Sequence, residues 1–174
     1  MRLKPLLLAV SFLSLFSFAR ADALKVGDAA PVQTVTIDDG SQVNLADVYR
    51  KGPTLLWFYP KANTGGCTAQ GCSLRDSNAE ITKRGVQIYG VSADEVAEQK
   101  SFREKQSYPF PLIADADKKL IGAFGESSLK FGGRANRTAY LVGKDGKVLW
   151  RDSESHTKDQ AEHVLAALDK LGIK

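Results

Sequence analysis

The sequence predicts an α/β protein with a central mixed β-sheet, flanking helices and a β-hairpin near the N-terminus. The continuous apolar run over residues 54–59 is typical of a strand that is covered on both faces. A helical pattern and a second apolar run, residues 86–92, follow it, and this order implies a parallel pair. Residues 138–142 and 148–151 flank Asp145-Gly146, a strong signal for an antiparallel hairpin. The sheet must therefore combine parallel and antiparallel neighbours.

The first elements form the N-terminal hairpin and the central strand. Residues 32–37 alternate between apolar and polar, residues 38–40 give a turn, and residues 42–45 complete a peripheral hairpin. The strand over residues 54–59 is placed at the centre of the sheet, and Pro60 ends it.

Helices account for most of the remaining chain. Residues 67–84 suit one helix that buries Leu74 and Ile81 and ends at Gly85. Asp94 can cap a helix over residues 95–106. After a short strand, Asp115 or Asp117 can cap the next helix, and a final amphipathic helix completes the fold. The short strand covers residues 111–114, and the helix after it ends at residue 124. The last helix covers residues 158–171, and its inward-facing side chains are those of Val164, Leu165, Leu168 and Leu171.

The first 21 residues have the pattern of a secretory signal peptide. Two basic residues precede an uncharged run over residues 5–19, and Ala19-Arg20-Ala21 fits a cleavage site, with Ala23 as a second possible end. The uncharged run is shorter than the roughly 20 residues that span a bilayer. We therefore expect an exported protein, periplasmic or secreted, without stable membrane association, in which residues 22–174 form one domain.

The charge of the chain argues against nucleic acid as a partner. The net charge is +4, but removal of the first 21 residues would lower it to +1. Basic residues form no cluster beyond pairs such as Lys118-Lys119, so no phosphate-binding surface is indicated.

Two cysteines carry the chemistry that the sequence indicates. Cys67 lies in the first turn of a predicted helix, where open backbone N–H groups and the helix dipole favour an ionised thiol. The hydroxyl of Thr64, three residues earlier, could hydrogen-bond the sulfur or a bound ligand. A free thiol is only about 3% thiolate at pH 7, so this placement predicts a reactive nucleophile. An inert buried cysteine with a capping threonine is the alternative interpretation.

The spacing of Cys67 and Cys72 bears on whether they can form a disulfide. On one regular helix, residues five apart have Cα atoms about 8.7 Å apart, whereas a disulfide needs about 7 Å or less. A bond would therefore require the helix to unwind, which Gly65, Gly66 and Gly71 would ease. A purely structural disulfide would close so small a loop that it would contribute only about 2 kcal/mol.

This segment resembles the peroxiredoxins, specifically the atypical two-cysteine type of bacterioferritin comigratory protein, also called the Q type. Pro60, Thr64 and Cys67 form the signature P-x-x-x-T-x-x-C, and Cys72 follows five residues later. Similarity covers most of residues 22–174 and continues through residues 74–76, 91–94, 109–115 and 136–146.

The resemblance implies a thioredoxin-like fold and a role for each site residue. Cys67 would be the peroxidatic cysteine, Cys72 the resolving cysteine, and Arg137 the guanidinium beside the thiolate. Pro60 would shield the site and Thr64 would orient the peroxide. The implied activity is reduction of hydrogen peroxide and organic hydroperoxides, with a thioredoxin-like dithiol as reductant. This chemistry needs no metal or organic cofactor. No long segment follows the last helix, so a resolving cysteine from another subunit is unnecessary, and we expect a monomer.

Two positions depart from the common pattern of this group. Gln70 stands where Glu is common, which predicts a more positive site. Gly65-Gly66 replaces Pro-Gly, which relaxes the loop before Cys67. Both changes bear on rate and peroxide preference, because neither removes a reacting group.

Other functions fit the sequence less well. A thiol:disulfide oxidoreductase would carry C-x-x-C and a cis-proline before the strand that begins at Thr138, where this chain has C-x-x-x-x-C and Arg137. A metal-binding or structural protein could use the two cysteines with His156 and His163, but their spacing lacks the usual zinc pattern.

Overall fold

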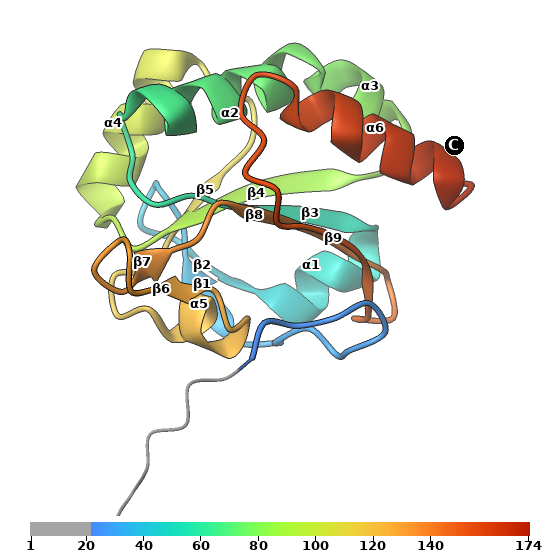
Figure 1. Cartoon of the computed structure of the whole chain (residues 1–174), viewed down its shortest axis with the longest axis horizontal. Coiled ribbons are helices and arrows are strands. Elements are labelled where there is room, and N and C mark those ends of the chain that lie inside the picture. The colour runs from blue at the N-terminus through green and yellow to red at the C-terminus, as the bar shows by residue number, and fades with distance from the viewer. Residues whose placement is uncertain (1–21) are drawn as a thin grey trace, which may run out of the picture.

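The computed structural model describes residues 22–174, and the predicted signal peptide lies outside the described residues. A five-stranded sheet with the order β5-β4-β3-β8-β9 runs through the middle of the molecule (Figure 1). Strands β3, β4 and β5 are parallel, whereas β8 and β9 pair antiparallel. The predicted mixed sheet, with its apolar strand at the centre, is therefore confirmed. The bounds are β3 Thr54–Phe58, β4 Gln87–Ser92, β5 Leu112–Ala114, β8 Thr138–Val142 and β9 Val148–Asp152.

Helices cover both faces of this sheet (Figure 1). One face carries α2 Gly65–Asp76, α3 Asn78–Lys83, α4 Val96–Gln106 and α6 Gln160–Lys170, and the other carries α1 Leu45–Lys51 and α5 Lys119–Ala123. The buried apolar residues form two clusters, one on each face of the sheet. Along β3, Leu55 and Trp57 belong to the cluster under α2 and α6, and Leu56 and Phe58 belong to the cluster under α1 and α5. All four are fully buried, which explains why this strand is continuously apolar.

Two small ribbons complete the fold. The predicted N-terminal hairpin is present as β1 Thr34–Thr36 and β2 Gln42–Asn44, paired antiparallel. A second ribbon, β6 Ser127–Ser128 and β7 Arg134–Ala135, was not predicted because two-residue strands carry no readable alternation.

Several predicted helix boundaries are wrong. The predicted second hairpin strand ends early, because Asn44 accepts a hydrogen bond from the Ala46 N–H and starts α1. The single helix predicted over residues 67–84 is two helices, starting at Gly65 and separated at Ser77. Leu171, predicted to face inward, follows the end of α6 and is 41% exposed.

The two predicted aspartate caps differ in outcome. Asp115 accepts hydrogen bonds from the N–H groups of Leu120 and Ile121 in the first turn of α5, although the N-cap residue is Lys118 and not Asp115 or Asp117 as predicted. Asp94 does not cap α4, whose N-cap is Glu95, and its carboxylate instead serves the loop beside Cys67.

None of the helices in residues 22–174 has the length and apolar character needed to cross a membrane.

Candidate active site

The loop after β3 presents Cys67 at the start of α2. Pro60 is buried at the end of the strand, and α2 begins five residues later, so that Cys67 is the third residue of the helix. The first helical hydrogen bond runs from the Thr68 N–H to the Thr64 carbonyl, at 2.8 Å. The N–H groups of the three preceding residues therefore have no partner within the helix and face the region where negative charge would develop.

A buried carboxylate fixes this loop. The side chain of Asp94 accepts hydrogen bonds from the Ala62 N–H at 2.7 Å and from the Ser92 hydroxyl at 2.8 Å. Its second oxygen pairs with Arg134 at 2.9 Å. Because Asp94 is 1% exposed, these three partners are what makes its charge tolerable, and they hold the loop in one position.

Arg137 lies beside the sulfur of Cys67. Its Nη2 atom is 3.4 Å from Sγ, and its Nη1 atom donates to the Gln70 side-chain oxygen at 2.7 Å. A Cβ atom at Gly66 would lie 3.1 Å from the same Nη2 atom, so the glycine leaves room for the guanidinium. The structure therefore brings Cys67 and Arg137 together across 70 residues of sequence.

Gln70 links this pair to a longer chain of buried amides. Its Nε2 donates to Oε1 of Gln160 at 2.8 Å, and Nε2 of Gln160 donates to Asp152 at 3.1 Å. A glutamate at position 70 could accept from Arg137 but, when ionised, could not donate to Gln160. Gln70 thus acts as acceptor and donor at once, a role that the sequence interpretation of a more positive site missed.

Gln160 and Asp152 themselves were not found from the sequence. They lie in α6 and at the end of β9, about 80 to 90 positions from Gln70 along the chain. No local motif marks them, because their connection to the site exists only after the sheet and α6 have packed.

The sequence offered the Cys67 sulfur as one of two possible partners for the Thr64 hydroxyl, and the structure shows a different contact. Its hydroxyl donates to the Lys61 carbonyl at 2.9 Å and makes no hydrogen bond to the sulfur of Cys67. Thr64 is the N-cap residue of α2 by position but makes no side-chain cap bond. Its side chain therefore stabilises the turn before the helix.

The sulfur is covered in this conformation. Cys67 is 1% exposed, whereas Thr64, Gly65 and Gly66 are exposed. Arg137 and Thr138 also line a cavity of about 240 Å³. Because Arg137 contacts the sulfur and also lines this cavity, the cavity lies on the guanidinium side of the site.

Cys72 lies on the same helix as Cys67, and both thiols are free. It is half-buried, packs against the core, and has its sulfur 3.8 Å from the side-chain oxygen of Gln106 at the end of α4. Because both residues belong to α2, the prediction that the helix must unwind before the sulfurs can bond keeps its geometric basis.

Gly71, next to Cys72, has a packing role that the sequence did not reveal. A Cβ atom at this position would lie 2.2 Å from the Tyr108 hydroxyl oxygen and 3.0 Å from the Trp57 ring. Burial, with a contribution from the nearby Cys72 thiol, raises the pKa of Tyr108. Only glycine allows the helix to approach these two aromatic rings so closely.

Gly71→Ala should therefore lower the free energy of unfolding by about 1–3 kcal/mol, because overpacking forces aromatic side chains from their positions. Urea unfolding followed by circular dichroism measures this change. Gly65→Ala is the matched control on the same helix, since a Cβ atom there meets nothing within 4 Å, and it should leave stability unchanged or slightly raised. Equal stability of the two variants would contradict the packing role of Gly71.

The two histidines do not join the cysteines. Within residues 22–174, the side chains with metal-ligand geometry are Asp152, His156 and His163. The hypothesis of a metal site that combines Cys67 and Cys72 with His156 and His163 is therefore wrong.

Comparisons with known proteins show the family to which the chain belongs. The model of the AhpC/TSA family matches residues 26–151. Peroxiredoxin Bcp of Escherichia coli (strain K12) is 40% identical over 132 residues, which are 72% of this chain and 83% of that protein.

Two solved structures show the same fold. Peroxidoxin BcpB from Mycobacterium tuberculosis superposes with a TM-score of 0.79 at 30% identity, covering 85% of this chain and 98% of that one. Bacterioferritin comigratory protein of Xanthomonas campestris gives a TM-score of 0.76 at 29% identity, covering 88% of this chain and all of that one. The thioredoxin-like fold inferred from the resemblance is confirmed. The chain belongs to the AhpC/TSA family and is a peroxiredoxin, a thiol-dependent peroxidase.

Proposed function

We propose that this peroxiredoxin reduces hydrogen peroxide and organic hydroperoxides through Cys67, with Cys72 as the resolving cysteine in the same chain. The observation that carries the proposal is the guanidinium of Arg137, 3.4 Å from the sulfur of Cys67. The fixed positive charge favours the thiolate, which is the nucleophilic form.

In the first step the thiolate of Cys67 attacks one peroxide oxygen and the O–O bond breaks. The sulfur is oxidised to sulfenic acid, and the second oxygen leaves as water or, from an organic hydroperoxide, as an alcohol after taking up a proton. Negative charge moves onto the departing oxygen, where Arg137 and the open N–H groups of α2 can donate hydrogen bonds. Organic substrates are supported by the Xanthomonas campestris relative, whose structure is described in terms of alkyl peroxide reduction.

In the second step Cys72 attacks the sulfenic sulfur, and water leaves as the disulfide forms. The first turns of α2 must unwind for this bond to form, because regular helix geometry keeps the two residues too far apart. A thioredoxin-like dithiol then reduces the disulfide by exchange, and α2 can refold.

We place this cycle in an exported compartment, on the basis of the signal-peptide pattern in residues 1–21. A thiol:disulfide oxidoreductase remains the alternative by fold. The spacing of the cysteines favours the peroxidase, since Cys67 and Cys72 form C-x-x-x-x-C and not the C-x-x-C pair of such an oxidoreductase.

Peptide mass spectrometry tests the proposal. One equivalent of hydrogen peroxide or cumene hydroperoxide, added to the reduced full chain, should consume both thiols. Trypsin cuts after Lys61 and Arg75, so both cysteines fall in the single peptide 62–75, which should become resistant to alkylation. The same digest reports where the N-terminus begins. Thiol loss with cysteines linked between chains, or faster insulin reduction than peroxide reduction, would contradict the proposal.

Oxidation should also change the fluorescence of Trp57. This side chain is fully buried, with its ring stacked on Tyr59 at 4.4 Å and edge-on to Tyr108 at 6.2 Å, and Tyr108 contacts α2. Unwinding of α2 would remove part of this packing. The Trp150→Phe variant leaves Trp57 as the single tryptophan, and stopped-flow fluorescence after peroxide addition should show a phase that Cys72→Ser lacks. An identical trace with and without Cys72 would contradict the unwinding.

A further inference from the structure

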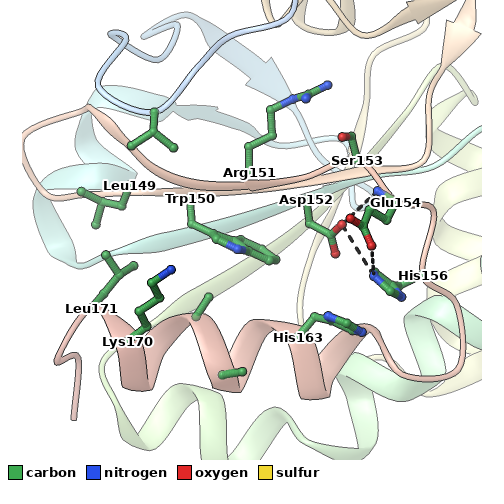
Figure 2. Close-up of a pocket in the computed structure, with 13 residues that line it drawn as sticks. Leu149, Trp150, Arg151, Asp152, Ser153, Glu154, His156, His163, Lys170 and Leu171 are labelled. Atoms are coloured by element: carbon green, nitrogen blue, oxygen red, sulfur yellow. Dashed lines mark hydrogen bonds and ion pairs between the residues drawn. The ribbon is translucent and has the colours of Figure 1, made fainter.

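A cavity of about 620 Å³ lies between β9 and α6 (Figure 2). Its wall includes Trp150 and three side chains whose ligand atoms all lie within 4.8 Å of one another, namely those of Asp152, His156 and His163. We propose that these three side chains bind one divalent transition-metal ion with the preferences of Zn²⁺. Neither the peroxidase chemistry nor the comparisons assign a function to this cluster.

In each of the three side chains, one atom is held by a hydrogen-bond partner and a second atom can bind an ion. Nδ1 of His156 lies 3.3 Å from the Asp159 carboxylate, which leaves Nε2, 3.9 Å from Oδ1 of Asp152. Nε2 of His163 lies 3.4 Å from the same Asp159 oxygen, which leaves Nδ1. A carboxylate that accepts the second ring N–H of a histidine ligand is the usual arrangement behind zinc sites, because it fixes the tautomer.

Asp152 follows the same rule. Its Oδ2 accepts from the Gln160 side chain, and its Oδ1 accepts from the Glu154 N–H at 3.0 Å and lies 3.9 Å from Nε2 of His156. Two partners therefore orient the carboxylate, and Oδ1 keeps a second lone pair for an ion. Because Gln160 is also the last amide of the chain that leads to Arg137, an ion here would act on the far end of the network that begins at the Cys67 sulfur.

The ligand set and its accessibility suit zinc. Two imidazoles and one carboxylate bind Zn²⁺ at about 2.0–2.2 Å, with donors about 3.3 Å apart in a tetrahedral shell. The rings of His156 and His163 are stacked with centroids 3.4 Å apart and planes 22° apart, so both side chains must rotate until their nitrogen lone pairs converge on one ion. The carboxylate of Glu154 lies 3.5 Å from Nε2 of His156 and is exposed, and either it or water from the cavity can complete the shell (Figure 2).

Zinc binding can be measured without any peroxidase assay. Cys67→Ser/Cys72→Ser in the untagged full chain removes the competing thiolates, and isothermal titration with zinc chloride follows removal of metal by a chelator. We expect one zinc ion per chain. His156→Ala and His163→Gln should each weaken zinc binding at least about tenfold. Loss of the hydrogen-bond partner behind a metal ligand already lowers metal affinity by about tenfold or more, and loss of the ligand itself should lower it further. Asp169→Asn, an exposed carboxylate change near the other end of α6, is the matched control and should bind as the parent does.

A second measurement locates the ion. Cu²⁺ prefers the same nitrogen ligands and quenches nearby tryptophan fluorescence, so it should quench Trp150 in the parent and not in His163→Gln. Circular dichroism shows whether each variant is folded. Absence of saturable zinc binding up to about 100 μM, a range in which even weak specific sites fill, would overturn the proposal. Binding that is unchanged in both folded histidine variants would overturn it as well.

Discussion

Cys67→Ser should abolish peroxide turnover completely, whereas Cys72→Ser should still consume one equivalent of peroxide. The serine hydroxyl at position 67 is not ionised at neutral pH, and Arg137 beside it cannot make it a nucleophile of comparable strength. In Cys72→Ser the first step needs only Cys67, so the reaction should stop at the sulfenic acid. Hydrogen peroxide consumption and trapping of sulfenic acid with a dimedone reagent measure the two outcomes.

The two variants control for each other because both change a sulfur on α2 to oxygen. If Cys72→Ser, like Cys67→Ser, failed to consume the first equivalent of hydrogen peroxide, Cys72 would take part in the first step. Residual turnover in Cys67→Ser would show that Cys67 is not the residue attacked by peroxide and would remove the basis of the proposed cycle.

Arg137→Met should slow the oxidation of Cys67 by about 10²–10³-fold, the effect of removing one preorganised donor to a developing oxyanion. Arg137→Lys should recover only part of the rate. The guanidinium reaches the sulfur with one nitrogen and Gln70 with the other, and a single ammonium group cannot hold both contacts in the same geometry. Stopped-flow measurement of peroxide oxidation in the Cys72→Ser background isolates this step.

Stability must be measured alongside these rates. Arg137→Met leaves the buried oxygen of Gln70 without its donor, which costs about 1–3 kcal/mol of folding free energy. Arg50→Met is the control, because it removes an exposed guanidinium on α1 that, among residues 22–174, pairs only with exposed Asp47. An oxidation rate in Arg137→Met within a few-fold of the parent would contradict a role for this charge in the reaction.

The sheet was predictable because its signals are local. The apolar run of β3, the Asp145-Gly146 turn between β8 and β9, and the spacing of the N-terminal hairpin each lie within a few residues. Helix α1 was missed although Asn44 and the buried Leu45 and Val48 have the required spacing, because the preceding strand was extended to Leu45 and no element was assigned to residues 46–53.

The site was predictable only in part for the same reason. Cys67, Cys72 and the helix that carries them lie in one segment, and Arg137 was found through the resemblance to peroxiredoxins. Spacing could not show that Gln70 bonds Gln160 or that Asp94 serves the loop and not α4, since these contacts join segments that meet only in the packed fold. The hydroxyl of Thr64 donates to the Lys61 carbonyl within its own turn, and the spacing of Thr64 and Cys67 in the sequence does not indicate this contact.

The packing of α2 in the reduced protein also bears on how readily the proposed Cys67–Cys72 disulfide can be reduced. Ser73, next to Cys72, accepts a hydrogen bond from the Ala161 N–H of α6 at 3.0 Å, and Gly71 lies against Tyr108. Any free energy that these contacts give the dithiol form is lost when the sulfurs join, so it raises the reduction potential of the couple by about 30 mV for each 1.4 kcal/mol. A tightly packed α2 therefore makes the oxidised enzyme a better electron acceptor for its reductant, and loosening the helix would leave it harder to recycle.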